Sequence, residues 1–575
     1  MDVVCLTKKM LFSIYILFSI LIGLKARSKL LMAIFFIAIP FAFISFDLIK
    51  NRLFKLKEYK LNKTQIFYVF LLLIANIWIF YCTFNRFSTQ SYSGTIRYIG
   101  AFLFLLLSGI ILYGIIILKS KINNLFFILC FSIGSYMMFF LPVRMVPDEN
   151  THIYTAYRES EILLGNANFA DNKILMRKTD REMFEDPIEV QFDAKMIEDY
   201  YGKMDFTPST EYISSFSEEL VVKNNDIAYW LPAIGLTIGK LMGLNGFYTL
   251  LLGRLFNLIL YVTLCYWAVK LMPFNKLLPC TISLLPIALQ QGMSYSYDAL
   301  IISSSLFVVC GTLKLYFDEY LNRKKNIILS LFIILFSIPL IVLKSHAYFM
   351  VGMIPEVFYL HKKYSLNRYV KPILILLLCG ICLYILIAFC LKFAGISKLV
   401  VEPTNPIAWA DNEQGYTIQY FINHPLDLMI ILGKSIISQF QYYLRSGTCS
   451  YLGWLNIIVT DKYVYAFTIL MFISSVKQTD CINNIEIDNA MKVTYGLTFL
   501  LTSIGVILGL VLAWTPLSSS VVLGVQGRYF IPVYVTLFLL IRNNKFVFNR
   551  DHSHLILILD LFMMILFFTS LMVRF

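Results

Sequence analysis

Long apolar runs recur along the whole chain and are separated mostly by short loops. Many of them have the roughly 17–25 residues that an α-helix needs to cross the hydrocarbon core of a bilayer. The runs that the pattern marks as spans cover residues 10–24, 30–49, 66–82, 98–118, 125–141, 248–271, 277–291, 299–317, 327–343, 347–360, 372–394, 463–476, 493–514, 529–541 and 555–573. We therefore expect an all-α polytopic membrane protein with about 13–15 spans, the shorter ones accommodated by tilt or by a thin bilayer.

Two further apolar stretches are predicted not to cross. Residues 228–243 form a short run that a proline interrupts and that directly precedes a stronger helix. Residues 426–445 carry polar side chains at spacings of 7, 4, 3 and 4, which form one polar stripe along a helix. A helix with such a stripe lies in the membrane interface or lines a cavity. We expect both stretches to be interfacial helices.

Basic residues in the short loops predict the orientation. Cytoplasmic loops carry an excess of lysine and arginine, so the basic loops that follow the runs 30–49, 98–118, 299–317, 347–360 and 529–541 are assigned to the cytoplasm. The loop 143–247 then lies outside the cell, and the expected location is the plasma membrane. The basic loop at 25–29 disagrees with this assignment, because it would also face outward.

Composition and charge support the membrane class and exclude others. Hydrophobic residues make up 58% of the 575 residues and charged residues only 15%, too few to cover the surface of a soluble protein of this size. The net charge is +14, yet residues 144–226 hold 18 acidic and 9 basic residues, so this stretch carries −9 and the remainder +23. Positive charge confined to loops between spans indicates membrane orientation, and no nucleic-acid partner is expected.

Five polar clusters fall on the predicted outer face, although they are spread over almost 400 residues. Charged groups at a membrane boundary are costly unless they have partners or a function. We therefore expect them to converge on one site. The clusters are Pro147–His152, Ser294–Asp298, Lys344–His346, Gly447–Asn456 and Gly524–Phe530.

The first cluster offers the acid pair Asp148 and Glu149. A carboxylate beside an apolar helix end tends to have a raised pKa, which suits a general base that activates an acceptor hydroxyl. The pair can alternatively hold a divalent cation, Mg or Mn, against a donor phosphate. A third interpretation is purely structural, because Pro-Asp-Glu before a helix is a common start signal.

The other clusters offer groups that bind phosphate. Arg528 follows two glycines and Gln526, and an arginine with flexible backbone at a helix start suits an anion. Lys344 and His346 stand at the outer end of a span, where a lysine is less expected. Interfacial anchoring remains the alternative for these cations. Supporting roles are expected for Asp298, Arg254, His152, Trp454 and Tyr529.

The chain resembles a bacterial family of multi-spanning membrane proteins of undefined function that is related to the GT-C glycosyltransferases. The resemblance rests on PDENTHIYTAYRES at 147–160, SYSYDAL at 294–300, GWL at 453–455 and GVQGRYFIP at 524–532, and runs from about residue 125 to the C-terminus. It implies a GT-C-like domain at 125–575, with short interfacial helices in the loop 143–247. Residues 1–124, with about four spans, form an added N-terminal region. The resemblance also implies a polyprenyl-phosphate sugar donor and assigns the essential acidic residue to Asp148, with Glu149 second.

The expected function is transfer of a sugar from a polyprenyl-phosphate donor to a cell-surface glycan or lipid on the outer face. The chain has no Walker A loop and no dinucleotide-binding glycine motif, so a cytoplasmic nucleotide-sugar donor is disfavoured. Polymerisation or ligation of a surface polysaccharide remains an alternative. A transporter or flippase of lipid-linked glycans is a weaker alternative, because the polar residues cluster at the outer boundary rather than inside the spans.

Overall fold

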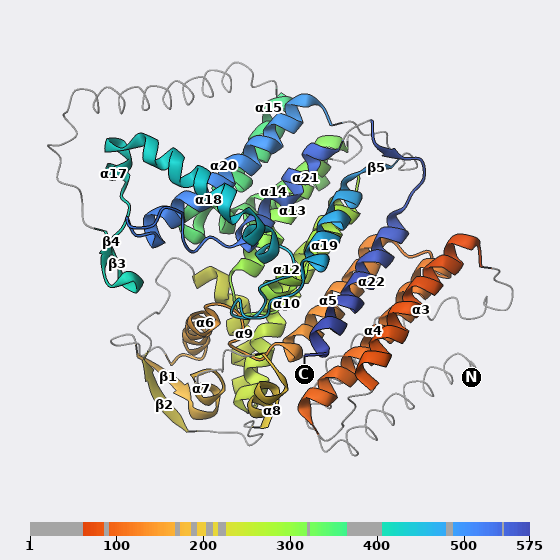
Figure 1. The fold of residues 1–575 in the computed structure, drawn as a ribbon, viewed down its shortest axis with the longest axis horizontal. Helices are drawn as coiled ribbons and strands as arrows, with labels where there is room; N and C mark the ends of the chain where they lie inside the picture. The colour runs from red at the N-terminus through yellow and green to blue at the C-terminus, as the bar shows by residue number, and fades with distance from the viewer. Residues whose placement is uncertain are drawn as a thin grey trace.

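The computed structural model describes residues 61–84, 91–166, 173–185, 192–202, 211–216, 226–318, 323–364, 405–478, 487–542 and 545–574 (Figure 1). The expected spans 10–24, 30–49 and 372–394 and the basic loop 25–29 lie outside these residues. Helices dominate the described part, as the sequence predicts.

Eight helices in the described part are long and apolar enough to cross a membrane. Their apolar residues run around most of each helix, so packing against neighbouring helices or lipid satisfies every face. These helices are α3 (Lys63–Phe84), α4 (Tyr92–Ile116), α5 (Ile122–Phe140), α10 (Gly246–Leu271), α13 (Asp298–Phe317), α14 (Arg323–Val342), α20 (Asn489–Trp514) and α22 (Ser553–Met572). The polytopic membrane class is thereby confirmed.

Two runs that we expected to be single helices are broken by proline. The run 277–291 forms α11 (Leu277–Ser283) and α12 (Pro286–Gly292), and the residue before Pro286 has an extended conformation. Proline lacks an N–H group and disfavours helical geometry in the preceding residue, so α11 ends there. The run 529–541 begins as a 3₁₀ helix, η6 (Gly527–Val533), which contains Pro532 and continues as α21 (Tyr534–Ile541).

Two other expected spans are short helices. α15 (Phe349–Tyr364) has 16 residues and α19 (Asp461–Ser475) has 15, against the roughly 20 of a straight transmembrane helix. A second 3₁₀ turn, η3 (Lys344–His346), separates α14 from α15. Neither short helix belongs to the eight long ones.

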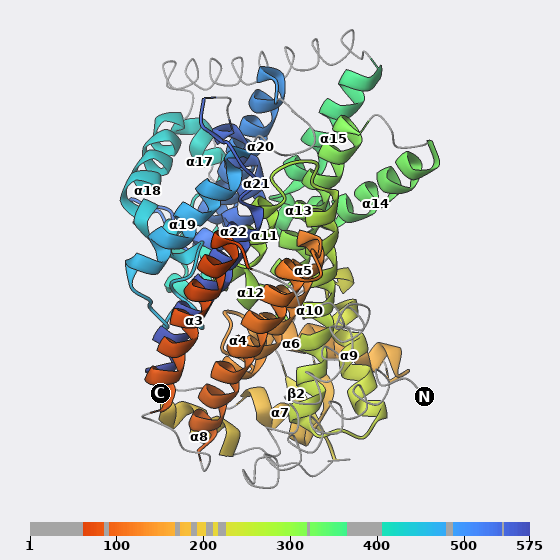
Figure 2. The same ribbon diagram turned by 90° about the vertical axis from the view of Figure 1, so that its right-hand side faces the viewer.

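The stretch 144–226, which we call the acidic segment, folds into short elements that gather at one end of the bundle, seen at the bottom of Figure 2. We expected only helices there, yet it also holds an antiparallel strand pair in which Lys173 faces Phe216. Strands of five residues leave a weak signal in sequence, and β1 buries Ile174, Met176 and Arg177 without an alternating pattern that could have been recognised. The elements are α6 (Glu149–Leu163), β1 (Lys173–Arg177), α7 (Lys178–Glu185), α8 (Ala194–Gly202) and β2 (Tyr212–Phe216).

The stretch 228–243 forms η2 (Asp226–Tyr229) and α9 (Trp230–Leu241), and α9 is not one of the eight long helices. Lys240 of α9 forms a buried ion pair with Glu161 of α6 at 2.7 Å. A second buried ion pair, Arg177 with Asp180 at 2.8 Å, ties β1 to α7. Each buried charge has a partner, which offsets its cost of desolvation and holds the acidic segment in one arrangement.

The stretch 426–445 lies in α18 (Pro425–Ser446), which follows α17 (Ile418–Asn423), and α18 is not one of the eight helices that are apolar enough to cross. One side of α18 is buried at Ile431 and Tyr443, whereas Met429, Ile437 and Phe440 are exposed. A helix with an exposed apolar side beside polar positions is typical of the membrane surface. Short strands β3 (Pro406–Ile407) and β4 (Glu413–Gln414), with η5 (Ala408–Ala410) between them, precede it.

The two ends of the bundle differ in charge. The N–H groups of Tyr92 and Ser93 donate to Glu198 of α8, so α4 begins at the end that carries the acidic segment, the acid end. α4 runs from there to the opposite end, the basic end, where β5 (Lys477–Gln478) pairs with β6 (Val547–Phe548). α3 and α4 pack beside α22 (Figure 1). The basic end carries Lys119, Lys121, Lys270, Lys276, Arg323, Lys324, Lys325 and Arg542.

Candidate active site at the acid end

Asp148 begins α6 in an unusual conformation. It occupies the N-cap position with φ of 60°, in the left-handed region, and its side chain makes no capping hydrogen bond. This conformation is energetically unfavourable for a non-glycine residue, although aspartate tolerates it better than most. The residue is exposed, whereas Glu149 beside it is fully buried. The two carboxylates therefore point into different surroundings, and the capping role that the sequence allowed for Asp148 is not used.

Glu149 forms a buried ion pair with Arg254 of α10. The guanidinium of Arg254 donates through Nε at 2.9 Å and through Nη2 at 2.6 Å, and both side chains are fully buried. The carboxylate also accepts from the backbone N–H groups of Arg144 at 2.7 Å and Tyr295 at 3.3 Å. Each oxygen of Glu149 thus accepts two hydrogen bonds, which fastens the start of α6 to α10 and to the turn before α13.

Asp298, Lys344 and Arg528 form a second ionic cluster from three separate segments. Lys344 Nζ lies 2.9 Å from one oxygen of Asp298, and Arg528 Nε lies 3.7 Å from the other. Asp298 and Arg528 are buried, and Lys344 is nearly so. Within the described residues Arg528 Nε has no hydrogen-bond partner, so this donor keeps capacity for another acceptor. Two cations facing one carboxylate leave the cluster with one net positive charge.

Aromatic side chains surround this cluster. Lys344 Nζ lies 3.6 Å from the ring centre of Tyr529, a cation–π contact that helps to hold the ammonium in place. The hydroxyl of Tyr348 donates to the backbone oxygen of Tyr529 at 2.9 Å. Burial raises the pKa of the Tyr297 hydroxyl, and the Asp298 carboxylate raises it further, as does Asp148 more weakly. The charge of Asp148 also acts on Arg528, and α6 lies beside the cluster because the ring of His152 contacts that of Tyr297.

His152 lies one turn into α6 and faces the same cluster. Its Nδ1 is 2.7 Å from the hydroxyl of Tyr229, and its ring stands at an angle of 82° to that of Tyr297, 5.1 Å away. Burial lowers the pKa of His152 to about 3, with Arg528 and Lys344 lowering it further and Asp298 opposing them. The imidazole is therefore neutral at physiological pH and serves as a buried hydrogen-bonding group.

The loop 447–456 is tied to the acidic segment and to α12. Trp454 donates its indole N–H to the backbone oxygen of Arg144 at 2.8 Å. The N–H of Gly453 donates to Gln290 of α12 at 2.8 Å. Gly453 has φ of +61°, which favours glycine, and an added Cβ would lie 2.6 Å from Asn456. Trp454 thus sits at the edge of the site and joins two segments 310 residues apart.

Gly527 sets the position of Arg528 through close packing. A Cβ at Gly527 would lie 1.8 Å from the backbone oxygen of Tyr443 and 2.4 Å from the nitrogen of Gly447, so only glycine fits. Its N–H donates to Ser446 Oγ at 2.8 Å. The end of α18 therefore packs directly against the turn that carries Arg528. This close packing explains why the Gln-Gly-Arg sequence has a glycine.

The expected site residues fall into three groups. Asp298, Lys344, Arg528, Tyr529 and His152 share one cluster, with Asp148 at its edge. Glu149 and Arg254 stand behind it as a structural pair. His346 is exposed and its Nδ1 contacts the backbone oxygen of Ile341 at 2.6 Å, whereas Gln526 Oε1 is buried without a hydrogen-bond partner in the described part. The backbone oxygen of Gln526 accepts from the N–H of Tyr529 at 3.1 Å, so Gln526 contacts the cluster through its backbone, and His346 shares the turn η3 with Lys344.

Three residues of the site were missed in the sequence. Tyr297 stands in the Ser-Tyr-Ser-Tyr-Asp motif and could have been named from it. Tyr348 follows the Lys344–His346 cluster by two residues, which is a weaker signal. Tyr229 directly precedes α9, and nothing in its sequence surroundings predicts its contact with His152, 77 residues away.

The residues of the site do not fit a divalent cation held by the acid pair. Both oxygens of Glu149 are occupied by four donors, so the carboxylate cannot share an ion with Asp148. The described residues contain no group of three or more histidine, cysteine, aspartate or glutamate side chains that could hold a metal. The positive charge at this site comes from Lys344 and Arg528 instead.

Comparison with known proteins identifies one family. The family model described as "Predicted membrane protein (DUF2142)" matches residues 130–537. The match begins near the residue at which the resemblance was expected to begin, and it ends before α22 rather than at the C-terminus. No curated protein and no solved structure matches the chain.

Proposed function

The chain belongs to the DUF2142 family of predicted membrane proteins, and we propose that it is a glycosyltransferase acting at the outer face of a bacterial plasma membrane. In this proposal it moves a sugar from a polyprenyl-phosphate donor to a glycan or lipid acceptor. One observation carries it: the exposed carboxylate of Asp148 stands beside the buried cationic cluster of Lys344, Arg528 and Asp298. A base next to a phosphate-binding group is the minimum that such a transfer requires.

The proposed orientation follows from the charges at the two ends of the bundle. The basic end carries the lysines and arginines of the short loops and faces the cytoplasm under the positive-inside rule. The acid end, with the acidic segment and the site, then faces outward. A donor with a polyprenyl tail reaches such a site from the bilayer, its tail lying against apolar helix surfaces.

Lys344 and Arg528 would bind the donor phosphate. Arg528 Nε is buried without a hydrogen-bond partner in the described part, so it can donate to a phosphate oxygen without first breaking a hydrogen bond. Asp298 forms ion pairs with both cations, with Lys344 at 2.9 Å and with Arg528 at 3.7 Å. On donor binding the phosphate would compete with Asp298 for Lys344, and the cluster's net positive charge favours that exchange.

Asp148 would act as the general base of an inverting transfer. The acceptor hydroxyl attacks the anomeric carbon and gives its proton to the Asp148 carboxylate. The bond between the anomeric carbon and the phosphate oxygen breaks at the same time, and polyprenyl phosphate leaves with the electron pair. Lys344 and Arg528 stabilise the charge that develops on this phosphate. Asp148 has φ of 60° and its side chain makes no capping hydrogen bond to α6.

His152, Tyr297 and Tyr529 would shape the site around the sugar. The neutral ring of His152 and the hydroxyl of Tyr297 offer hydrogen bonds to sugar hydroxyls without adding charge. Trp454, exposed at the edge, provides an apolar surface on which a sugar ring can stack. We also propose that the fold is GT-C-like over residues 125–575, because short helices such as α7, α8 and α9 lie at the acid end beside the site.

A second candidate, transport of lipid-linked glycans, is favoured by one observation. Asp560 is buried inside α22, where it accepts from Thr281 of α11 at 2.9 Å, and its other oxygen has no hydrogen-bond partner in the described part. An ionisable residue within a span often marks a transport path. Polymerisation or ligation of a surface polysaccharide would use the same groups as transfer of one sugar, and it would change glycan length rather than composition.

The experiment compares Asp148→Asn with Glu182→Gln, which removes an exposed carboxylate from α7 of the same acidic segment. Each variant is expressed at wild-type level in a strain that lacks the protein, and the surface glycans are analysed for sugar composition. We expect Asp148→Asn to lose one sugar and Glu182→Gln to keep it. Unchanged glycan composition in the Asp148→Asn strain overturns the catalytic assignment. If the sugar is lost in an Asp560→Asn strain but kept in the Asp148→Asn strain, the result favours transport.

A further inference from the structure

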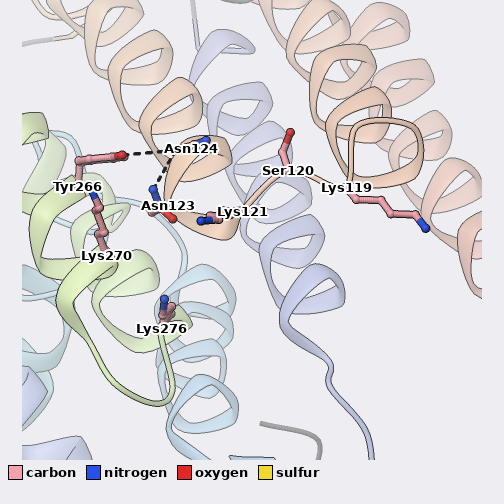
Figure 3. Close-up of a pocket in the computed structure, with 8 residues that line it drawn as sticks. All are labelled: Lys119, Ser120, Lys121, Asn123, Asn124, Tyr266, Lys270 and Lys276. Atoms are coloured by element: carbon pink, nitrogen blue, oxygen red, sulfur yellow. Dashed lines mark hydrogen bonds between the residues drawn. The ribbon is translucent and has the colours of Figure 1, made fainter. Parts of the chain in front are cut away.

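A cavity of about 570 Å³ opens at the basic end, far along the bundle from the candidate active site. It lies between the turn joining α4 to α5 and the turn joining α10 to α11 (Figure 3). The described residues that line it are Lys119, Ser120, Lys121, Asn123, Asn124, Tyr266, Lys270 and Lys276. Four of these eight are lysines and none is acidic.

Hydrogen bonds fix the backbone of both turns that carry the lysines. In the first, Lys119 has φ of 49°, and the N–H of Ser120 donates to Gly114 at 2.9 Å. In the second, Asn275 has φ of 44°; its amide donates to the backbone oxygens of Ser474 and Val476 and accepts from Arg542. Figure 3 shows Lys121 on the first of these turns and Lys276 on the second, on two sides of the space between them. Like charges held in this way favour an anion between them.

Neutral donors stand beside the lysines. The Asn123 amide donates to Asn124 Oδ1 at 2.8 Å, and the Tyr266 hydroxyl points at the same oxygen from 3.4 Å. Lys270 packs its ammonium 4.0 Å from the Trp267 ring. Ammonium, amide and hydroxyl groups together are the donors that surround a phosphate oxygen in proteins.

An exposed stripe on α10 leads from the cavity toward the middle of the membrane. Lys270, Trp267, Thr263 and Ile259 are exposed at spacings of 3, 4 and 4 residues, which places them along one face of the helix. Trp267 is 41% and Ile259 43% exposed although both lie inside a membrane-spanning helix. A tryptophan above an apolar stripe is typical of a lipid-facing surface near the headgroups.

We propose that this cavity binds the phosphate headgroup of an anionic phospholipid, with an acyl chain lying along the α10 stripe. Lys121, Lys276 and Lys270 would neutralise the phosphate, and Asn123 and Asn124 would orient it. The stripe favours a lipid over a soluble phosphate, because a soluble anion would gain nothing from it. Basic pockets between transmembrane helices at the cytoplasmic side bind such headgroups. The proposal is independent of the transfer reaction at the acid end.

The test uses the full-length protein in nanodiscs of phosphatidylcholine with or without phosphatidylglycerol. Bound phosphatidylglycerol is counted by native mass spectrometry, and Tm is measured in parallel. The variant Lys121→Gln/Lys276→Gln removes two charges from the cavity. The matched control Lys324→Gln/Lys325→Gln removes two charges from the start of α14, at the same end of the bundle and outside the cavity.

We expect phosphatidylglycerol to bind and to raise the Tm of the wild type and of the control. The cavity variant should bind phosphatidylglycerol roughly 30-fold more weakly, because each substitution removes about one interaction between a lysine and the headgroup. A Lys121→Arg/Lys276→Arg variant keeps both charges and should retain binding, which separates loss of the site from loss of the fold. Equal binding by both glutamine variants overturns the proposal. So does a Tm increase of the same size with inorganic phosphate alone, which identifies a soluble anion as the ligand.

Discussion

The carboxylate of Glu149 and the guanidinium of Arg254, 105 residues apart in the chain, form a fully buried ion pair with contacts of 2.9 and 2.6 Å. The pair joins the first turn of α6 to the middle of a spanning helix. Asp148 stands next to Glu149 in the chain and is exposed, whereas Glu149 is buried. The ion pair therefore fixes the backbone beside Asp148, the candidate base.

Removing one partner of this pair should destabilise the protein strongly. Glu149→Ala leaves the Arg254 charge buried without its carboxylate, and we expect a loss of about 3–5 kcal/mol in unfolding free energy. The double variant Glu149→Leu/Arg254→Met removes both charges and should recover much of that loss. The measurement is the thermal unfolding of purified protein in detergent. A Glu149→Ala protein with wild-type Tm and no activity would instead assign Glu149 to the chemistry.

Lys344 should contribute to donor binding and to the transfer step. Lys344→Gln removes one of the two cations of the cluster, and we expect kcat/KM for the polyprenyl-phosphate donor to fall by about 10²-fold. The measurement is transfer of a radiolabelled sugar by the reconstituted protein. Lys462→Gln, at an exposed position in the first turn of α19, is the matched control and should leave the rate unchanged. Equal rates for the two variants contradict a phosphate-binding role for Lys344.

Sugar transfer should proceed without a divalent cation. The four hydrogen bonds to Glu149 keep it from binding a metal together with Asp148, and two cationic side chains already supply the positive charge. We expect the rate to persist after treatment with excess EDTA and dialysis. A rate that falls to background and returns with Mg²⁺ or Mn²⁺ contradicts this prediction.

The sequence predicted the spans well where apolar runs are long and free of proline. α4, α5, α10, α13 and α20 each fall on an expected run. It failed where backbone chemistry overrides hydropathy, at Pro286 and Pro532, because apolar composition does not distinguish a continuous helix from two short pieces. The β1–β2 strand pair was missed because five-residue strands carry little periodic signal.

The site was accessible from the sequence only in part. The polar clusters around Asp298, Lys344 and Arg528 stand out because charge is rare in apolar surroundings, and the structure places all three in contact. The different surroundings of Asp148 and Glu149 could not be predicted. They depend on one left-handed residue and on an arginine 105 residues away, neither of which has a local sequence signature.

Gly527 should tolerate no side chain. A Cβ there would lie 1.8 Å from the backbone oxygen of Tyr443, so Gly527→Ala must displace α18 or the turn that carries Arg528. We expect a loss of about 3 kcal/mol or more in stability, together with loss of activity. Gly433→Ala is the matched control within α18, since its Cβ meets nothing within 4 Å. It should be neutral or stabilising by up to about 1 kcal/mol, and similar Tm values for the two variants would contradict the packing argument.

The burial of neutral His152 should make stability fall in acid. Its pKa is about 3 in the folded protein against 6.5 for an unperturbed histidine, because burial, Arg528 and Lys344 disfavour the charged ring more than Asp298 favours it. Between these two values the unfolded chain binds more protons than the folded one, so the contribution of His152 is complete above pH 6.5 and declines as the pH falls toward 3. At pH 5 the loss is about 2 kcal/mol.

The matched comparison isolates this residue from other titrating groups. Tyr229 and Tyr297 contact the His152 ring, and the charges that act on it are those of Asp298, Arg528 and Lys344. We expect the Tm of the wild type to fall more steeply between pH 7 and pH 5 than that of His152→Gln. The control His424→Gln replaces a half-exposed histidine and should follow the wild type. Parallel curves for His152→Gln and the wild type would show that His152 is protonated in the folded protein, and that the cluster of Lys344 and Arg528 does not exclude a third positive charge.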